Sequence, residues 1–416
     1  MHKKISVDRL RLGMHVHELC GPWIDHPFWR TKFTLNDPRD LVAAQTSGVT
    51  HCWIDTAKGL DVALPEEAAP QIVVAPAPPP VAPPAVARPA VAVPQVAMEE
   101  ELKRAVVLLQ QARQEVVTMF GQARLGLAVD VQACLPLVES IVASVGRNGG
   151  ALVSMARLKT RDDYTYMHSV AVCTLMVALA HQLGLDEDET RTVGMAGLLH
   201  DLGKAVMPLD VLNKPGKLSD EEFRLIQSHP ERGHELLTQS GEADPDVLDV
   251  CLHHHEKIDG TGYPHRLKED QISLHARMGA VCDVYDAITS YRPYKPGWDP
   301  AESIGKMADW RRGRFDEAVF QAFVRSLGIY PTGALVRMRS ERLAVVVEQN
   351  PATLTAPNVK VFYSTRSQMH IPPELIDLSR PGCSERIVGR ESNQHWKFTH
   401  LDELWAGTEL LHQMTR

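Results

Sequence analysis

His200 and Asp201 stand side by side and are the residues of this chain best suited to metal chemistry. The two residues are expected to share one helical turn, where the aspartate, with its two oxygens, can bridge two metal ions while the imidazole holds one of them. Further histidines and aspartates follow at intervals that suit facing helices of a bundle. They are His229, the run His253 to His255, Asp283 and Asp286. The pattern predicts a hydrolytic site with two metal ions.

The cost of burial helps to interpret single residues. His168 lies in an apolar helical pattern, where a histidine is more often a hydrogen-bonded core residue than a ligand. Asp201 follows an apolar helix and would be costly to bury without a cation, which favours a metal. His229 begins a helical segment, so a solvated helix end is an equal alternative when this residue is taken alone.

Helix geometry sets an expectation for neighbouring candidates. Consecutive helical residues diverge by about 100°, so two adjacent histidines are expected to reach two different ions about 3.5 to 4 Å apart. The third histidine of the run is expected to face solvent or to support a ligand. Asp283 and Asp286 share a helix face, so one can bind an ion while the other orients a ligand or a basic residue.

Cations and one tyrosine between these residues suit an anionic substrate. Lys204 follows the His-Asp pair by one turn, and Tyr263 lies in a glycine-rich turn from which its ring can stack on a base or touch a phosphate. Further cations lie in loop-like sequence at Lys214, Lys217, Arg292 and Lys295. In an acidic protein, such a local group of cations is how a phosphate is held.

Composition divides the chain into four segments around these residues. Short strand-like runs predict a small α/β or β-rich domain at 1–64, with one helix candidate at 38–45, and a Pro/Ala-rich linker follows at 65–97. Helical periodicity predicts an all-α bundle at 98–327, and β-branched runs predict a small β-rich region at 328–416. The fold class is therefore mostly α, and the C-terminal region is expected to be a scaffold without chemistry.

The first helix of the bundle admits two interpretations. Apolar residues from Leu102 to Phe120 recur at helical spacing, with charged residues on the other face. The helix either packs on the domain that follows it or forms a coiled-coil homodimer through residues near 99–125. Further helices are predicted at 131–145, 151–158, 164–183 and 188–202.

Global properties bound the class of protein. The 416 residues carry a formal net charge of -8, which argues against binding a nucleic-acid polymer. Seven cysteines without CxxC spacing fit reduced thiols in the cytoplasm. The longest apolar run, Val170 to Ala180, is far below the roughly 20 residues of a membrane span, so no membrane association is expected.

Several sequence blocks resemble a known family. His168, His200-Asp201 and Asp283 are the pattern of HD-superfamily phosphohydrolases, and the run from His254 through Tyr263-Pro264 resembles the HD-GYP subgroup of cyclic di-GMP phosphodiesterases. Supporting blocks lie in order between Leu158 and Leu327: His200 to Lys204, Pro208 to Leu218, Ser228 to Gly233 and Arg292 to Tyr294. The N-terminal segment is similar to a small domain often found ahead of this one, whose role as a regulatory domain is the expectation here.

The resemblance implies a role for each matching residue. His168, His200, Asp201 and Asp283 would hold one divalent ion, and Asp201 would bridge to a second ion held by the remaining histidines, His229, His254 and His255. Asp201 and Lys204 would be catalytic, and Asp286 would orient a ligand. The residues expected to bind the phosphates of the dinucleotide are Lys204, Tyr263, Arg292 and Lys295. The position of a third-metal glutamate is Tyr164 here, with Asp163 before it, so two ions are expected.

The implied activity is that of a cyclic-guanylate-specific phosphodiesterase. A water bridging two ions of Fe, Mn, Ni or Zn would be deprotonated near neutral pH and attack the phosphorus, giving linear pGpG and, in a second round, GMP. Two alternatives stay open: a member that senses cyclic di-GMP without cleaving it, and a hydrolase of another cyclic dinucleotide. Signalling proteins are the expected partners beside the substrate.

Overall fold

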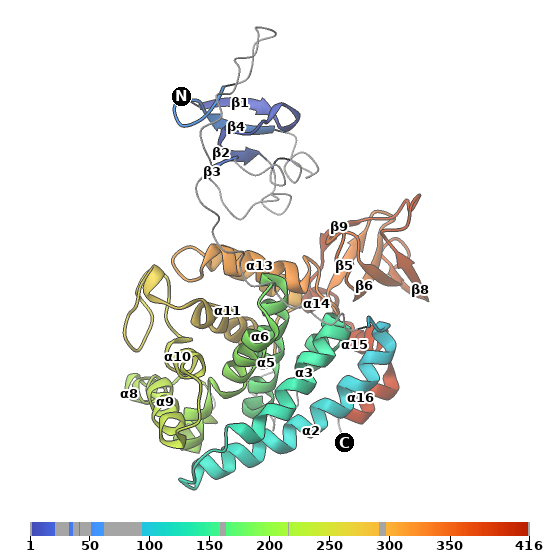
Figure 1. The fold of residues 1–416 in the computed structure, drawn as a ribbon. Helices are drawn as coiled ribbons and strands as arrows, with labels where there is room; N and C mark the ends of the chain where they lie inside the picture. The colour runs from blue at the N-terminus through green and yellow to red at the C-terminus, as the bar shows by residue number, and fades with distance from the viewer. Residues whose placement is uncertain are drawn as a thin grey trace. The chain divides into compact units, whose positions relative to one another are not determined.

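The chain forms two compact units, Met1–Ala90 and Val91–Arg416 (Figure 1). The computed structural model describes residues 2–20, 33–35, 41, 51–61, 94–158, 164–214, 216–290 and 297–414. The helix candidate at 38–45 and the Pro/Ala-rich linker lie largely outside the described residues. The four-part domain division remains a prediction.

The first unit is built around a small antiparallel sheet. Its strands are β1 (His2–Ser6), β2 (His15–Cys20), β3 (Phe33–Thr34) and β4 (His51–Asp55), in the order β1-β4-β2-β3. Alternate residues point to opposite faces of a strand, so one face of this sheet collects the apolar side chains. The core they form consists of Ile5, Val7, Leu10, Met14, Val16, Leu35, Cys52 and Ile54. This confirms the β-rich N-terminal segment that the sequence predicts.

The second unit begins with a helical bundle, as predicted for a mostly α chain. Its helices are α2 (Met98–Arg124), α3 (Leu135–Arg147), α4 (Gly149–Ala156), α5 (Tyr164–Leu183), α6 (Glu187–Leu199), α7 (Leu209–Leu212), α8 (Asp220–Ile226), α9 (His229–Ser240), α10 (Pro245–His253), α11 (Leu274–Thr289), α12 (Pro300–Trp310) and α13 (Glu317–Leu327). A capping box between Asp186 and Glu189 satisfies free N–H groups where α6 begins.

Helix α5 is the central helix of the bundle, where it contacts α2, α3, α4, α6, α11 and α13. Its segment Thr165–Leu183 is long and apolar enough to cross a membrane, and 78% of that window is buried inside the unit. This is more apolar sequence than the run Val170 to Ala180 suggested. A helix that is apolar on all sides is expected wherever neighbours cover every face of it.

Helix α2 packs on the bundle with the face that the periodicity singles out. Leu102, Val106 and Phe120 are buried, while Val107 and Val117 are exposed. Near the start of α2, the fully buried Glu101 accepts hydrogen bonds from Ser144 and Arg147 of α3. The packing alternative therefore describes the inner face of this helix. The dimer remains a prediction for its outer face.

A second antiparallel sheet follows the bundle. Its strands are β5 (Leu335–Met338), β6 (Arg342–Glu348), β7 (Asn358–Ser364), β8 (Met369–Asp377) and β9 (Ile387–Arg390), in the order β8-β7-β6-β5-β9. The sheet shares its core with α12 through Ala301. Three short helices close the chain: α14 (Asn393–Trp396), α15 (Leu401–Ala406) and α16 (Thr408–Met414). They pack the C-terminal region onto the rest of the unit, α15 against β6 and α16 against α2.

Candidate metal centre

The predicted ligands lie where helices begin or end. Helix α6 ends at Leu199, His200 caps it, and Asp201 leads into the 3-10 helix η4 (Leu202–Val206). His229 is the first residue of α9, and His254 caps the end of α10. His200 and Asp201 therefore do not share a regular helical turn, which corrects the expectation from the sequence. The break in the helix lets both side chains turn to the same interior point.

Seven side chains converge there in two groups. Within each group, the atoms that can bind a metal all lie within 4.8 Å of one another. The first group is His168, His200 and Asp283, and the second is Asp201, His229, His254 and His255. Six of these seven residues are buried, and His255 is partly exposed. Imidazole nitrogens and carboxylate oxygens are the donors that divalent transition metals use in such sites.

Asp201 stands between the two groups. Its Oδ2 lies 3.4 Å from the Nε2 atoms of both His168 and His200. Its Oδ1 lies 3.1 Å from His229 Nε2 and 3.8 Å from His254 Nε2. Each carboxylate oxygen thus faces a different group of histidines, which is the arrangement that a bridging carboxylate requires.

His254 and His255 lie in the same group, so the expectation that adjacent histidines reach different ions is wrong. That expectation assumed a continuous helix, whereas α10 ends at His253. The rings of His254 and His255 are 4.1 Å apart between centroids. His253 points elsewhere, with its Nδ1 2.7 Å from Asp249 and its Nε2 2.9 Å from His265.

The other ring nitrogen of each buried histidine has a fixed partner. The Nδ1 atoms of His200 and His229 each lie 2.7 Å from a backbone carbonyl oxygen, those of Gly197 and Ile226. His168 Nδ1 lies 2.6 Å from Asp286 Oδ2. An acceptor at Nδ1 places the proton there and leaves the Nε2 lone pair free for a metal.

The charges of the site fit the same interpretation. Burial lowers the pKa of His229, His254 and His255, the last to about 3, so these rings are neutral at physiological pH. Burial acts to raise the pKa of Asp201, but the charge of Lys204 and the contacts with the neighbouring histidines prevail and hold it well below its usual range. Neutral imidazoles and an ionised carboxylate are the protonation states in which these side chains bind metals.

Two atoms test whether the residues fit a metal. His200 Nε2 and Asp201 Oδ1 are buried and have no hydrogen-bond partner among the described residues. His229 Nε2 approaches Asp201 Oδ1 to 3.1 Å, but outside hydrogen-bond geometry. Buried polar atoms without a partner cost about 1 to 3 kcal/mol each, so they are rare unless a ligand satisfies them. The donor set therefore fits divalent ions on both sides of Asp201.

Gly203 lets α9 approach the metal centre. A Cβ atom at this position would stand 1.9 Å from the backbone oxygen of His229 and 2.6 Å from the nitrogen of Gly233. These neighbours are backbone atoms and cannot turn away as a side chain does. The absence of a side chain at Gly203 therefore brings the loop after Asp201 against the start of α9.

We expect Gly203→Ala to destabilise the protein by about 3 kcal/mol, because α9 must move away from η4. The same movement withdraws His229 from its group, so bound metal should fall as well. Thermal unfolding and metal analysis of the purified variant measure both effects. Gly121→Ala is the matched control, since a Cβ atom there meets nothing within 4 Å. Equal melting temperatures for the two variants would contradict the role given to Gly203.

The predicted substrate residues fall into two sets. Lys204 Nζ lies 2.5 Å from Asp201 Oδ2, and the Tyr263 ring lies 4.7 Å from that of His255 between centroids. Both side chains line a cleft of about 580 Å³ that also contains His168, His229 and Asp283. Arg292 and Lys295 lie outside the described residues, as does the side chain of Tyr164.

The cleft also contains residues that the sequence analysis did not single out as site residues. Glu256 lines it and accepts hydrogen bonds from the backbone N–H groups of His265 and Leu267, which shapes the turn that carries Tyr263. Trp310 and Arg314 enter the cleft from the connection between α12 and α13. A buried glutamate beside the histidine run was a usable signal, but nothing in the local sequence pattern pointed to the last two.

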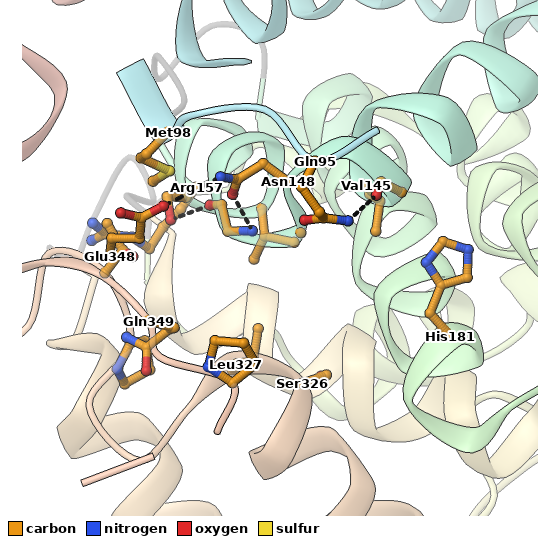
Figure 2. Close-up of a pocket in the computed structure, with 18 of the residues that line it drawn as sticks. Gln95, Met98, Val145, Asn148, Arg157, His181, Ser326, Leu327, Glu348 and Gln349 are labelled. Atoms are coloured by element: carbon orange, nitrogen blue, oxygen red, sulfur yellow. Dashed lines mark hydrogen bonds between the residues drawn. The ribbon is translucent and has the colours of Figure 1, made fainter. Parts of the chain in front are cut away.

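A second cavity, of about 370 Å³, lies in the same unit away from the metal centre (Figure 2). Arg157, His181 and Glu348 are among the side chains around it. Tyr285 lines this cavity, whereas Asp283 of the same helix lines the cleft. Residues two apart on a helix are about 200° apart, so α11 separates the two spaces. The cavity holds both signs of charge and none of the seven predicted ligands.

The chain is similar to several known proteins. Residues 151–319 match the HD domain family, and residues 2–134 match a domain of unknown function, DUF3391. Over 408 residues, 98% of this chain and 96% of the relative, the chain is 55% identical to the cyclic di-GMP phosphodiesterase PA4108 of Pseudomonas aeruginosa. It is 39% identical over 161 residues to 3'3'-cGAMP-specific phosphodiesterase 2 of Vibrio cholerae, covering 38% of this chain and 31% of that protein.

Bd1817, an HDG"Y"P protein from Bdellovibrio bacteriovorus, matches with a TM-score of 0.46 and 18% sequence identity, over 78% of this chain and 98% of that one.

Proposed function

The chain belongs to the HD domain family, with PA4108 as a relative along nearly its whole length, and from this premise we propose that it hydrolyses cyclic di-GMP to linear pGpG. The observation that carries the proposal is Asp201, whose two oxygens face two separate groups of metal-binding side chains. A site of this kind suits hydrolysis of a phosphodiester. The relative's name supports the guanine dinucleotide as the substrate.

The proposed ligands divide as the two groups do. His168, His200 and Asp283 would hold one divalent ion, the three histidines of the other group, 229, 254 and 255, would hold the second, and Asp201 would be shared. The donor set is compatible with Fe, Mn, Ni or Zn. When bound, two such ions supply a water that is acidic near neutral pH and positive charge for the phosphoryl oxygens.

The chain's own side chains would bind and orient the substrate. Lys204 is a cation at the edge of the metal groups and would neutralise charge on a phosphoryl oxygen during attack. Burial raises the pKa of Tyr263, so its hydroxyl keeps its proton and donates a hydrogen bond to a phosphate oxygen. Asp286 would hold the ring of His168 in place through the contact at Nδ1.

Turnover of cyclic di-GMP by the metal-loaded protein tests this function. We expect linear pGpG to accumulate first, with GMP appearing later if a second round occurs. Protein that has been treated with a chelator should form neither product. Parallel reactions with 3'3'-cGAMP and cyclic di-AMP test the alternative that the protein hydrolyses another cyclic dinucleotide. The Vibrio cholerae relative is named for the first of these substrates. Tight binding of cyclic di-GMP without any product would instead support a sensor.

The proposal extends to the oligomeric state, the compartment and the partners of the protein. The exposed apolar side chains Val107 and Val117 of α2, and Leu125 directly after it, support a homodimer through the outer face of this helix. The described cysteines are all free thiols, which supports a reducing compartment, and we place the protein in the cytoplasm. Signalling proteins remain the proposed partners of the N-terminal unit.

A further inference from the structure

Arg314 lines the cleft with an unused set of hydrogen-bond donors. Its guanidinium carbon lies 5.8 Å from the ring centroid of Trp310 and 5.5 Å from that of Phe315. Among the described residues, no side chain or backbone oxygen accepts a hydrogen bond from this guanidinium, and none forms an ion pair with it. A partly buried arginine normally satisfies several of its five N–H groups. The free donors of Arg314 are therefore available to a ligand in the cleft.

The backbone holds Arg314 at a defined place beside the metal centre. The N–H of Asp259 donates to the carbonyl oxygen of Gly313 over 2.8 Å, and the N–H of Ile258 donates to that of Arg314 over 3.4 Å. Gly313 has a φ of +76°, and a Cβ atom there would meet Asp259 Oδ2 at 2.8 Å. The turn before α13 is thus fastened to the turn that carries Tyr263. The hydrogen bonds between these two turns therefore fix the positions of Arg314 and Tyr263 together.

The wall of the cleft around Arg314 is apolar. Helix α11 contributes Ala280, Val284, Ala287 and Ile288, and Trp310 and Phe315 extend this surface. A phosphate would lose its hydration against such a wall, whereas the face of a purine ring gains from contact with it. The described cations that line the cleft elsewhere are Lys204 and Lys257. Arg314 is the described cation that lies beside the aromatic rings of this wall.

We propose that Arg314 recognises the O6 and N7 edge of a guanine base that lies against the apolar wall, and that it selects guanine over adenine. Both O6 and N7 are acceptors and match a group that only donates, whereas adenine presents a donor at N6. Trp310 and Phe315 position the guanidinium, and the ring of Trp310 offers an aromatic surface beside the base. This inference rests on the proposed function, since it names how that substrate is distinguished.

Steady-state kinetics of Arg314→Ala with two dinucleotides tests the inference. We expect kcat/KM for cyclic di-GMP to fall about 10- to 100-fold, mainly through KM, and kcat/KM for cyclic di-AMP to change little. Arg314→Gln should favour adenine, because glutamine pairs with the N6 and N7 positions of that base. Arg312→Ala is the matched control, since Arg312 is exposed and lies outside the cleft.

Calorimetric binding separates this inference from the proposed function. Metal-stripped wild-type protein should bind cyclic di-GMP more tightly than the metal-stripped Arg314→Ala variant, whether or not the loaded enzyme turns it over. Absence of product with wild-type protein would overturn the proposed function alone if this difference in affinity persists. An equal loss for both dinucleotides would mean a phosphate contact and would overturn the inference, as would unchanged kinetics and affinity for cyclic di-GMP.

Discussion

Asp201→Asn is expected to abolish cyclic di-GMP hydrolysis, with kcat/KM reduced on the order of a thousandfold or more. The substitution removes the negative charge that faces both histidine groups while leaving the volume of the side chain almost unchanged. The helical circular dichroism should therefore stay close to that of the wild type. Product formation at saturating metal concentration measures the loss.

Asp210→Asn is a suitable control for this experiment, because Asp210 is an exposed carboxylate on the neighbouring helix α7. It should retain wild-type turnover. Substantial residual activity of the Asp201 variant would count against a shared carboxylate. A collapse of the helical signal would instead assign Asp201 a structural role.

Asp286→Ala should weaken metal binding at the group that contains His168 by about 10- to 100-fold. The reason is the 2.6 Å contact between Asp286 Oδ2 and His168 Nδ1, which fixes the ring and its proton. Burial opposes a positive charge on His168, but contacts with Asp283 and Asp286 prevail and raise its pKa. A titration with Mn²⁺ that resolves two binding steps measures the change.

The second binding step should stay near its wild-type affinity in this variant, because the ring that Asp286 holds is that of His168, which belongs to the first group. Asp309→Ala removes an exposed carboxylate from α12 and serves as the control. Equal weakening of both steps would point to general damage. Unchanged affinity in both steps would show that Asp286 does not support a ligand.

The sequence indicated which residue types bind the metal ions, but not how the backbone positions those residues around one point. His168, His200 and Asp201 could be recognised from residue type, spacing and family resemblance. Regular helix geometry then misplaced the neighbours, because it assumed that α10 continues through His254 and His255. Where a helix stops depends on tertiary packing as well as on local propensity. Adjacent residues at such an end can face one point.

Residues brought to the cleft by distant chain connections escaped prediction. Trp310 ends α12, and Arg314 belongs to the following turn, whose position depends on hydrogen bonds with residues 258 and 259. No periodic pattern encodes such a contact between two loops. Gly203 is similar, since its importance appears only once the backbone of His229 is known to lie against it.

Parts of the C-terminal region were predictable because their local sequence pattern, and not a contact between distant loops, identifies them. Strands β5, β6 and β7 contain β-branched runs with buried positions, and these runs were recognised. Strand β8 is an edge strand that is exposed along most of its length, so it shows no alternation of apolar and polar residues. Its pairing with β7 became clear only from the structure.

Anomalous diffraction from crystals of the Mn²⁺-loaded protein tests the shared carboxylate most directly. We predict two strong peaks in the cleft, one beside His168, His200 and Asp283, the other beside His229, His254 and His255, with the carboxylate of Asp201 between them. A single peak, or peaks away from Asp201, would contradict the account.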